Sequence, residues 1–219
     1  MLTWSALRTA TLDEADAGWF GGVAPPLVER ARASRLGRRL LSRRLASHGA
    51  PVLFGTLPRS TPQSIAVSTW AVWPSQRLRA IAWDLGAIAL GPALRAVVRR
   101  EAVLRVRSVL GEERYALALA SAPNVATTAD REHRVLSKSL ASDEVLGAAV
   151  RRLGFGEFVA FARAVHPACA ERVLLGEVPG SVPETKLAWL DASRVATHLA
   201  ALPAAANEGT IDHGASHHH

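Results

Sequence analysis

The chain has almost no cysteine, since Cys169 is the single one among 219 residues. One thiol cannot form a disulfide within the chain, which excludes a disulfide-stapled scaffold and favours a reducing compartment. Long apolar runs are also missing: the longest uncharged apolar stretch, 85–94, is about half of the length that spans a bilayer. Residues 1–18 lack the basic segment and apolar run of a secretory signal. We therefore expect a soluble, cytosolic protein.

Motifs for catalysis, metal binding and phosphate binding are missing as well. His166 and Cys169 would be candidates for a nucleophile and its base or for two metal ligands, but further ligands at zinc spacing are lacking. A cysteine between alanines is typical of a small buried hydrophobe. The run Gly154-Phe155-Gly156 lacks the third glycine and the preceding strand of a dinucleotide-binding motif, so we interpret it as a helix break. We expect no enzyme, no cofactor and no small-molecule substrate.

The residues that are abundant favour helices. Apolar residues make up 49% of the chain, enough for a sizeable core, and alanine, leucine and arginine outnumber β-branched and aromatic residues. The composition and periodicity predict an all-α fold: one compact helical domain over 1–203 with about seven to nine helices. Residues 204–219 are expected to form a flexible tail, whose closing histidines are typical of a purification tag.

Caps, prolines and glycines predict where the helices begin and end. In the first half of the chain, the sequence predicts a helix with a capping box at Thr11 and Glu14, a helix over 25–47 opened by two prolines, and two helices within 75–109 that are separated at Gly91-Pro92. Two further helices are predicted over 112–120 and 129–140. The C-terminal part is predicted to contain a helix capped at Ser142 or Asp143 and broken at 154–156, a short helix up to Leu175, and a final helix that runs from a capping box at Ser181 and Glu184 to Leu202.

Two segments need separate expectations. Residues 49–74 are rich in proline and are predicted to be irregular, tied to the core by Trp70 and Trp73. Asp84 lies within an apolar helix, and burying a carboxylate without a partner is costly, so we expect it to pair with Arg79, Arg95 or another arginine.

Positive charge is concentrated in the first half of the chain. The net charge is +7, with residues 1–110 strongly basic and residues 111–203 mildly acidic. Along the helix predicted over 25–47, one face carries arginines and the other carries apolar residues that include Leu27, Leu36, Leu40, Leu41 and Leu45. The candidate protein-interaction residues are Arg30, Arg35, Arg38, Arg39 and Arg43.

Two interpretations of these arginines are open. They form a docking face for an acidic partner, or they form a solvated helix face in an arginine-rich chain with only two lysines. A nucleic acid is the less favoured partner, because no aromatic residues alternate with these arginines.

Three segments in the central and C-terminal sequence share an order of apolar helix faces and glycine or proline breaks. They are RLRAIAWDLGAIALGPALRAVV (77–98), VLGEERYALAL (109–119) and LGFGEFVAFARAVHPACAERVLLGEVP (153–179). In these segments the sequence resembles the SctK/YscK family of type III secretion accessory proteins. The resemblance implies an all-helical, non-enzymatic cytosolic adaptor at the inner membrane's cytosolic face. It would link the cytoplasmic domain of an SctD-like ring protein to SctQ-like sorting-platform pods. The alternative prediction is a basic, helical regulator that binds nucleic acid.

Overall fold

The computed structural model describes residues 2–56, 64–65, 69–121, 126–181 and 189–203. These residues form eleven α-helices, two 3₁₀-helices and one pair of two-residue strands, which confirms the predicted all-α fold. The elements are β1 (Leu2–Thr3), α1 (Trp4–Glu14), η1 (Ala17–Phe20), α2 (Pro25–Arg32), α3 (Arg35–His48), α4 (Pro51–Phe54), β2 (Ser64–Ile65), η2 (Thr69–Val72), α5 (Ser75–Arg95), α6 (Arg100–Leu110), α7 (Glu112–Ala120), α8 (Ala126–Ser139), α9 (Asp143–Val165), α10 (Pro167–Leu175) and α11 (Ala192–Ala201). The helices outnumber those predicted because 25–47 holds two helices and α4 adds a short one.

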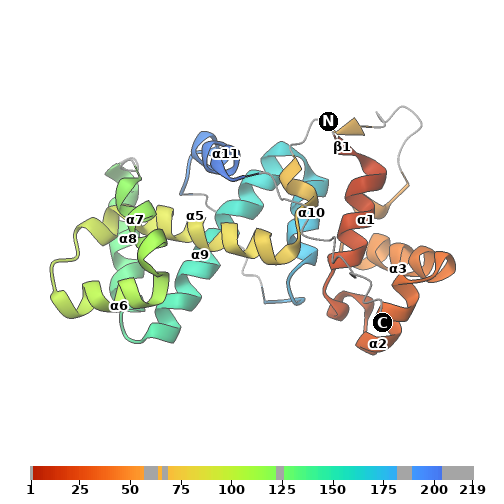
Figure 1. The fold of residues 1–219 in the computed structure, drawn as a ribbon, viewed down its shortest axis with the longest axis horizontal. Coiled ribbons are helices and arrows are strands. Elements are labelled where there is room, and N and C mark those ends of the chain that lie inside the picture. The colour runs from red at the N-terminus through yellow and green to blue at the C-terminus, as the bar shows by residue number, and fades with distance from the viewer. Residues whose placement is uncertain (1, 57–63, 66–68, 122–125, 182–188, 204–219) are drawn as a thin grey trace, which may run out of the picture.

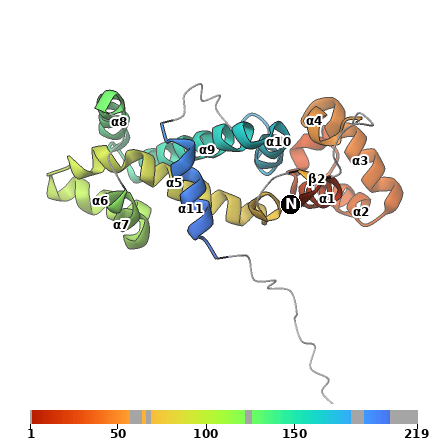
Figure 2. The ribbon, with the colours of Figure 1, turned by 90° about the horizontal axis from the view of Figure 1, so that it is seen from above.

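The molecule is elongated along its two longest helices. Helices α5 and α9 pack together through the middle, α1–α4 lie at one end, and α6–α8 lie at the other (Figures 1 and 2). One connected cluster of buried apolar side chains runs through both ends. Within the described residues, no helix has both the length and the apolar character needed to cross a membrane.

Glycines allow α5 and α9 to cross at backbone distance. A Cβ atom on Gly154 would lie 1.7 Å from the carbonyl oxygen of Ala82, and one on Gly86 would lie 2.1 Å from that of Val150. The predicted helix break at 154–156 is therefore wrong, because α9 runs unbroken through these residues. Its glycines serve close helix packing, which overrides their low helix propensity.

The predicted break at Gly91-Pro92 is also wrong, since α5 continues through Pro92 to Arg95. A Cβ atom on Gly91 would lie 2.4 Å from the carbonyl oxygen of Ala118 in α7, so this glycine too marks a close helix contact. The chain leaves the helix only at 96–99, where Val98 is 90% exposed, and α6 begins at Arg100.

The first helix begins earlier than predicted. Thr3, not Thr11, is its N-cap, and the Thr3 side chain accepts a hydrogen bond from the amide of Ala6. Thr11 lies within α1, where its hydroxyl donates to the carbonyl of Leu7 at 2.7 Å, so the predicted capping box with Glu14 does not form. The N-cap predicted at Ser142 is confirmed by its bond to the amide of Val145.

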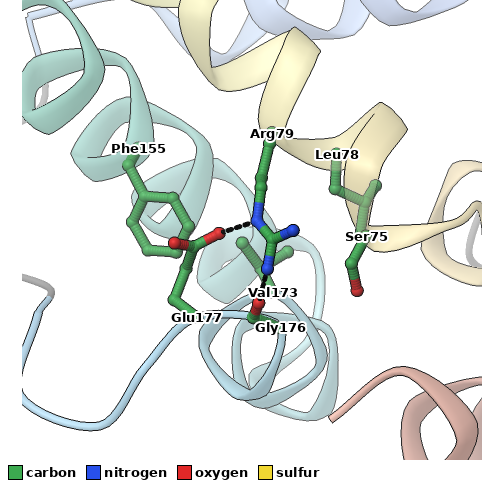
Figure 3. Close-up of a pocket in the computed structure, with 7 residues that line it drawn as sticks. All are labelled: Ser75, Leu78, Arg79, Phe155, Val173, Gly176 and Glu177. Atoms are coloured by element: carbon green, nitrogen blue, oxygen red, sulfur yellow. Dashed lines mark hydrogen bonds and ion pairs between the residues drawn. The ribbon is translucent and has the colours of Figure 1, made fainter. Parts of the chain in front are cut away.

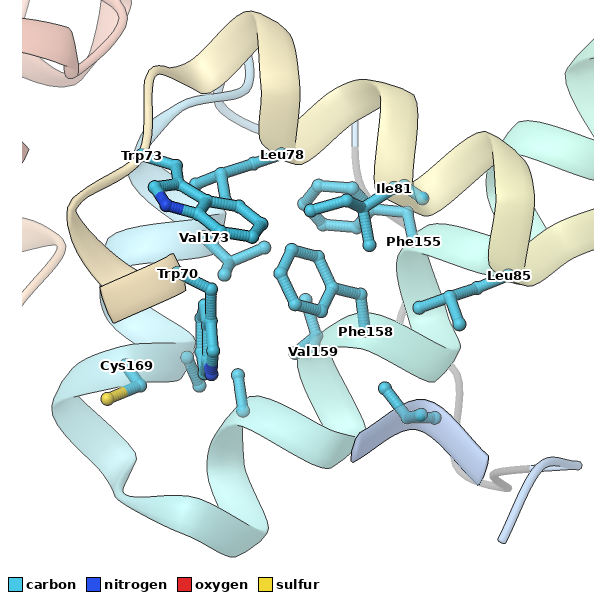
Figure 4. Packing of buried hydrophobic residues seen from close by; sticks show 14 of the residues in the cluster. Trp70, Trp73, Leu78, Ile81, Leu85, Phe155, Phe158, Val159, Cys169 and Val173 are labelled. Carbon is cyan, nitrogen blue, oxygen red and sulfur yellow. The ribbon is translucent and has the colours of Figure 1, made fainter. Parts of the chain in front are cut away.

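The proline-rich segment 49–74 is less irregular than predicted, because it contains α4, β2 and η2. Its predicted anchors are confirmed: Trp70 and Trp73 are buried against α9 and α10 (Figure 4). The Trp70 ring lies 5.2 Å from the ring of Phe158, centroid to centroid. Cys169 is fully buried in the core cluster, as its alanine neighbours predicted.

Buried polar side chains fasten the segments between helices. Arg172 of α10 is fully buried and donates hydrogen bonds to the carbonyl of Trp73 and the hydroxyl of Ser75, and this burial lowers its pKa to about 10. Its Nε has no hydrogen-bond partner among the described residues. This arginine ties α10 to the start of α5.

The last described helix is held by a carboxylate. Glu157 of α9 is buried, and its two oxygens accept the backbone N–H groups of Trp189 at 2.6 Å and Leu190 at 2.9 Å. Helix α11 then starts at Ala192 with Asp191 as N-cap, later than the predicted start at Ser181. The predicted partner in that capping box, Glu184, lies outside the described residues, as does the predicted tail.

Candidate functional site

The predicted arginine helix is two helices joined by a sharp turn. Helix α2 starts at two prolines, whose fixed φ suits the first turn of a helix. It ends at Arg32, and Ser34 adopts an extended backbone and accepts a hydrogen bond from the amide of Gly37, which starts α3. Because a Cβ atom on Gly37 would lie 2.3 Å from the carbonyl oxygen of Ala31, this turn brings α3 against α2 at backbone distance.

Several arginines at this end of the molecule have internal partners. Arg8 donates to the carbonyls of Leu53 at 2.6 Å and Gly55 at 3.0 Å, which fastens α1 to α4. Arg32 donates to the carbonyls of Leu12 and Ala15. These guanidinium groups satisfy backbone carbonyls at helix ends, and they serve the fold.

The five predicted interaction residues divide into two groups. Arg38 forms an ion pair with Asp13 at 2.7 Å and also donates to the carbonyl of Arg32, so its charge serves the contact between α1 and α3. The other four are Arg30 on α2 and Arg35, Arg39 and Arg43 on α3. They are exposed, and their guanidinium groups make no hydrogen bond or ion pair with any described residue.

Three of these exposed arginines share one face of α3. Arg35, Arg39 and Arg43 are spaced four residues apart, which places them in one row along the solvent side of the helix. The opposite side is buried through Gly37, Leu41 and Leu45.

Two leucines lie beside this arginine row. Leu36 is 68% exposed and Leu40 is 56% exposed, although the apolar pattern predicted that both would lie on the buried face. Two pairs of leucines recur at a spacing of four in α3, and one helix side can bury only one of them. The pair Leu41 and Leu45 is the buried one. We call Arg35, Leu36, Arg39, Leu40 and Arg43 the α3 outer face.

The other polar residues examined from the sequence have structural roles. His166 caps α10, since its Nδ1 accepts the amide of Ala168 at 3.1 Å. Asp84 forms an ion pair with Arg114 at 2.7 Å, as predicted, and its second oxygen lies 3.3 Å from Nε2 of His198. Within the part of the chain that the structure describes, no three His, Cys, Asp or Glu residues are placed to hold a metal ion.

Cys169 is expected not to react with thiol reagents in the folded protein. Burial raises the pKa of its thiol to about 11, and thiols react as thiolates. We expect no labelling by a disulfide reagent over an hour at pH 8, and complete labelling after unfolding in guanidinium chloride. A Ser47→Cys variant, with its new thiol exposed on α3, is the control that should react at once. Rapid labelling of the native wild-type chain would contradict the buried placement.

A small depression between α5 and α10 does not have the size of a ligand site. It encloses about 170 Å³ of space outside atoms, open solvent included, and Arg79 crosses it to form an ion pair with Glu177 at 2.6 Å (Figure 3). Small-molecule pockets typically start at about 300 Å³. Among the described residues, the α3 outer face is therefore a stronger candidate for a binding site than this depression.

The chain matches no protein-family model, and no curated protein or solved structure matches it either.

Proposed function

We propose that this protein is a non-enzymatic adaptor that binds a partner protein through the arginine-bearing face of α2 and α3. The observation that carries the proposal is the contrast between the arginines of this end. Arg32 and Arg38 are held by internal partners, whereas Arg35, Arg39 and Arg43 have none among the described residues.

The cost of this arrangement to the fold supports a role in binding. Like charges four residues apart destabilise a helix by about 0.2–0.5 kcal/mol per pair. The arginine row of α3 contains two such pairs, Arg35 with Arg39 and Arg39 with Arg43. An acidic partner would relieve this repulsion and would be attracted to the surface over a distance of about one Debye length.

The family resemblance supports a more specific proposal. As an SctK-like accessory protein of a type III secretion system, the chain would link the cytoplasmic domain of an SctD-like ring protein to an SctQ-like pod protein. It would then act in the cytoplasm, at the cytosolic face of the inner membrane. The row of exposed arginines would bind an acidic surface on one of these two partners.

Charge reversal tests the arginine row directly. For the triple variant Arg35→Glu, Arg39→Glu and Arg43→Glu, we expect at least about tenfold weaker binding to one of the two secretion proteins, because each contact turns from attraction to repulsion. The measurement is isothermal titration calorimetry with a purified SctD-like cytoplasmic domain and a purified SctQ-like protein.

The matched control reverses three exposed arginines on α9, namely Arg151, Arg152 and Arg163. It changes the net charge by the same amount as the α3 variant. It therefore distinguishes binding at the three arginines of α3 from attraction by the overall charge of the protein. Equal loss in both triple variants would contradict a specific site. If neither secretion protein binds the wild-type chain, the secretion-system proposal is wrong. A salt-dependent shift of duplex DNA at low salt would then favour the regulator predicted as the alternative.

A further inference from the structure

The α3 outer face combines charge with exposed apolar surface. Leu36 and Leu40 lie one helical turn apart beside the arginine row, and each residue is more than half exposed. Two exposed leucines in one row, directly beside the arginine row, form a small apolar stripe on an otherwise cationic helix face. The pairing of both kinds of side chain indicates a partner that offers carboxylates and an apolar stripe together.

This face cannot turn inward to hide its leucines. On its other side, α3 is held by the buried Leu41 and Leu45 and by the backbone contact of Gly37 with Ala31. The ion pair from Arg38 to Asp13 of α1 holds the same helix from the side. Within the described residues, no element covers these two leucines, and α3 cannot rotate to bury them.

We propose that the α3 outer face docks one amphipathic, acidic helix of a partner protein. The leucine row would receive the apolar stripe of that helix, and the arginine row would pair with carboxylates that recur every three or four residues. This inference rests on the proposed adaptor function and specifies the kind of partner segment that the adaptor takes.

The geometry favours a helix as the occupant. The eight residue steps from Arg35 to Arg43 rise about 12 Å at 1.5 Å per residue, and both rows run along the helix axis. A partner helix lying along α3 presents its own side chains in rows of the same spacing, so ridges of one helix fit grooves of the other. Helix-in-groove recognition uses anchors at this spacing.

Other occupants fit the face less well. Nucleic acid would use the arginines but would leave Leu36 and Leu40 facing phosphates, and α3 contains no aromatic side chain on which a base could stack. Membrane-surface helices carry a wide apolar face rich in Trp, Phe and Leu opposite their cationic face. On α3 the buried pair Leu41 and Leu45 is used by the protein itself, which leaves one exposed leucine pair with the arginine row at its side.

The test measures binding of defined probes to the full chain. The main probe is a fluorescent, synthetic helical peptide of about 18 residues, long enough to be partly helical in water, with a leucine stripe flanked by glutamates. The comparison probes are a peptide of the same composition with the stripe scrambled, a duplex DNA of random sequence and vesicles of phosphatidylcholine with phosphatidylglycerol. Fluorescence anisotropy reports peptide and DNA binding, and sedimentation reports vesicle binding.

We expect the amphipathic peptide to bind at least about tenfold more tightly than the scrambled one, because only the ordered stripe covers both leucines. The double variant Leu36→Ser and Leu40→Ser should lose at least about tenfold in affinity for it. The matched control is Leu104→Ser on α6, which removes a leucine that is 53% exposed at the other end of the molecule and should change the affinity by less than about twofold. All three leucines are exposed, so thermal unfolding should be unchanged in these variants.

The outcomes separate this inference from the proposed function. Equal binding of both peptides, unaffected by the leucine substitutions, would show that the surface binds by charge alone and would overturn the inference. A complete lack of peptide binding would also overturn it. Vesicle or DNA binding that is lost in the leucine variant would assign the face to that other class of partner. Peptide binding without binding of either secretion protein would reject only the secretion-system adaptor.

Discussion

Replacing Gly154 with alanine is expected to prevent the protein from folding or to lower its stability by more than about 4 kcal/mol, a size reserved for severe core disruption. The new Cβ atom would lie 1.7 Å from the carbonyl oxygen of Ala82 and 2.4 Å from the amide nitrogen of Gly86. Both are backbone atoms of α5, so no side chain can move aside and the two central helices must separate. Urea unfolding followed by circular dichroism measures the loss.

The control for this experiment lies on the same helix. A Cβ atom on Gly147 would lie 3.4 Å from the side chain of Trp83 and 3.7 Å from that of Val109, which is ordinary van der Waals contact. Gly147→Ala is therefore expected to raise stability by up to about 1 kcal/mol, because alanine restricts the unfolded chain and favours a helix. If both variants had the same small effect, the close crossing of α5 and α9 would be incorrect.

Replacing Glu157 with glutamine is expected to cost about 3 kcal/mol and to loosen the C-terminal part of the described structure. The carboxylate accepts the amides of both Trp189 and Leu190, each with a separate oxygen. A glutamine side chain has one acceptor oxygen, and its NH₂ group would face the second amide donor inside the protein. Hydrogen exchange should accelerate at these two amides and through α11.

The exposed Glu144, also on α9, is the matched control. Glu144→Gln makes the same chemical change in the first turn of the helix, where loss of a favourable charge costs less than about 1 kcal/mol. Local exchange near Trp189 should not change in this control. Similar stability losses in both variants would show that Glu157 does not hold the segment before α11.

The sequence predicted helices better than it predicted their interruptions. Apolar periodicity and the proline pair at 25–26 located several helices, and Ser142 was recognised as a cap. The glycines at 91 and 154 were misread as breaks because a local rule treats glycine as a helix breaker. In the fold they lie where another backbone passes within contact distance. Such a contact joins residues far apart in the chain, so no local pattern reveals it.

The candidate site could be predicted only in part. The spacing of Arg35, Arg39 and Arg43 places them in one row in any helix that contains them, so the sequence alone specified that row. The exposure of Leu36 and Leu40 depends on which side of α3 is packed against α2 and α4. The engagement of Arg38 by Asp13 similarly requires that α1 and α3 lie side by side.

Helix α9 also determines how this molecule responds to mechanical load. Its 23 residues form one unbroken rod of about 34 Å. At one end it packs against α6, and at the other it continues into α10, which contacts α1 and α4 (Figure 2). A pull between the two ends of the molecule would therefore load the crossing of α5 and α9. The protein would behave as a stiff spacer, whose length stays nearly constant until those two helices slide past each other.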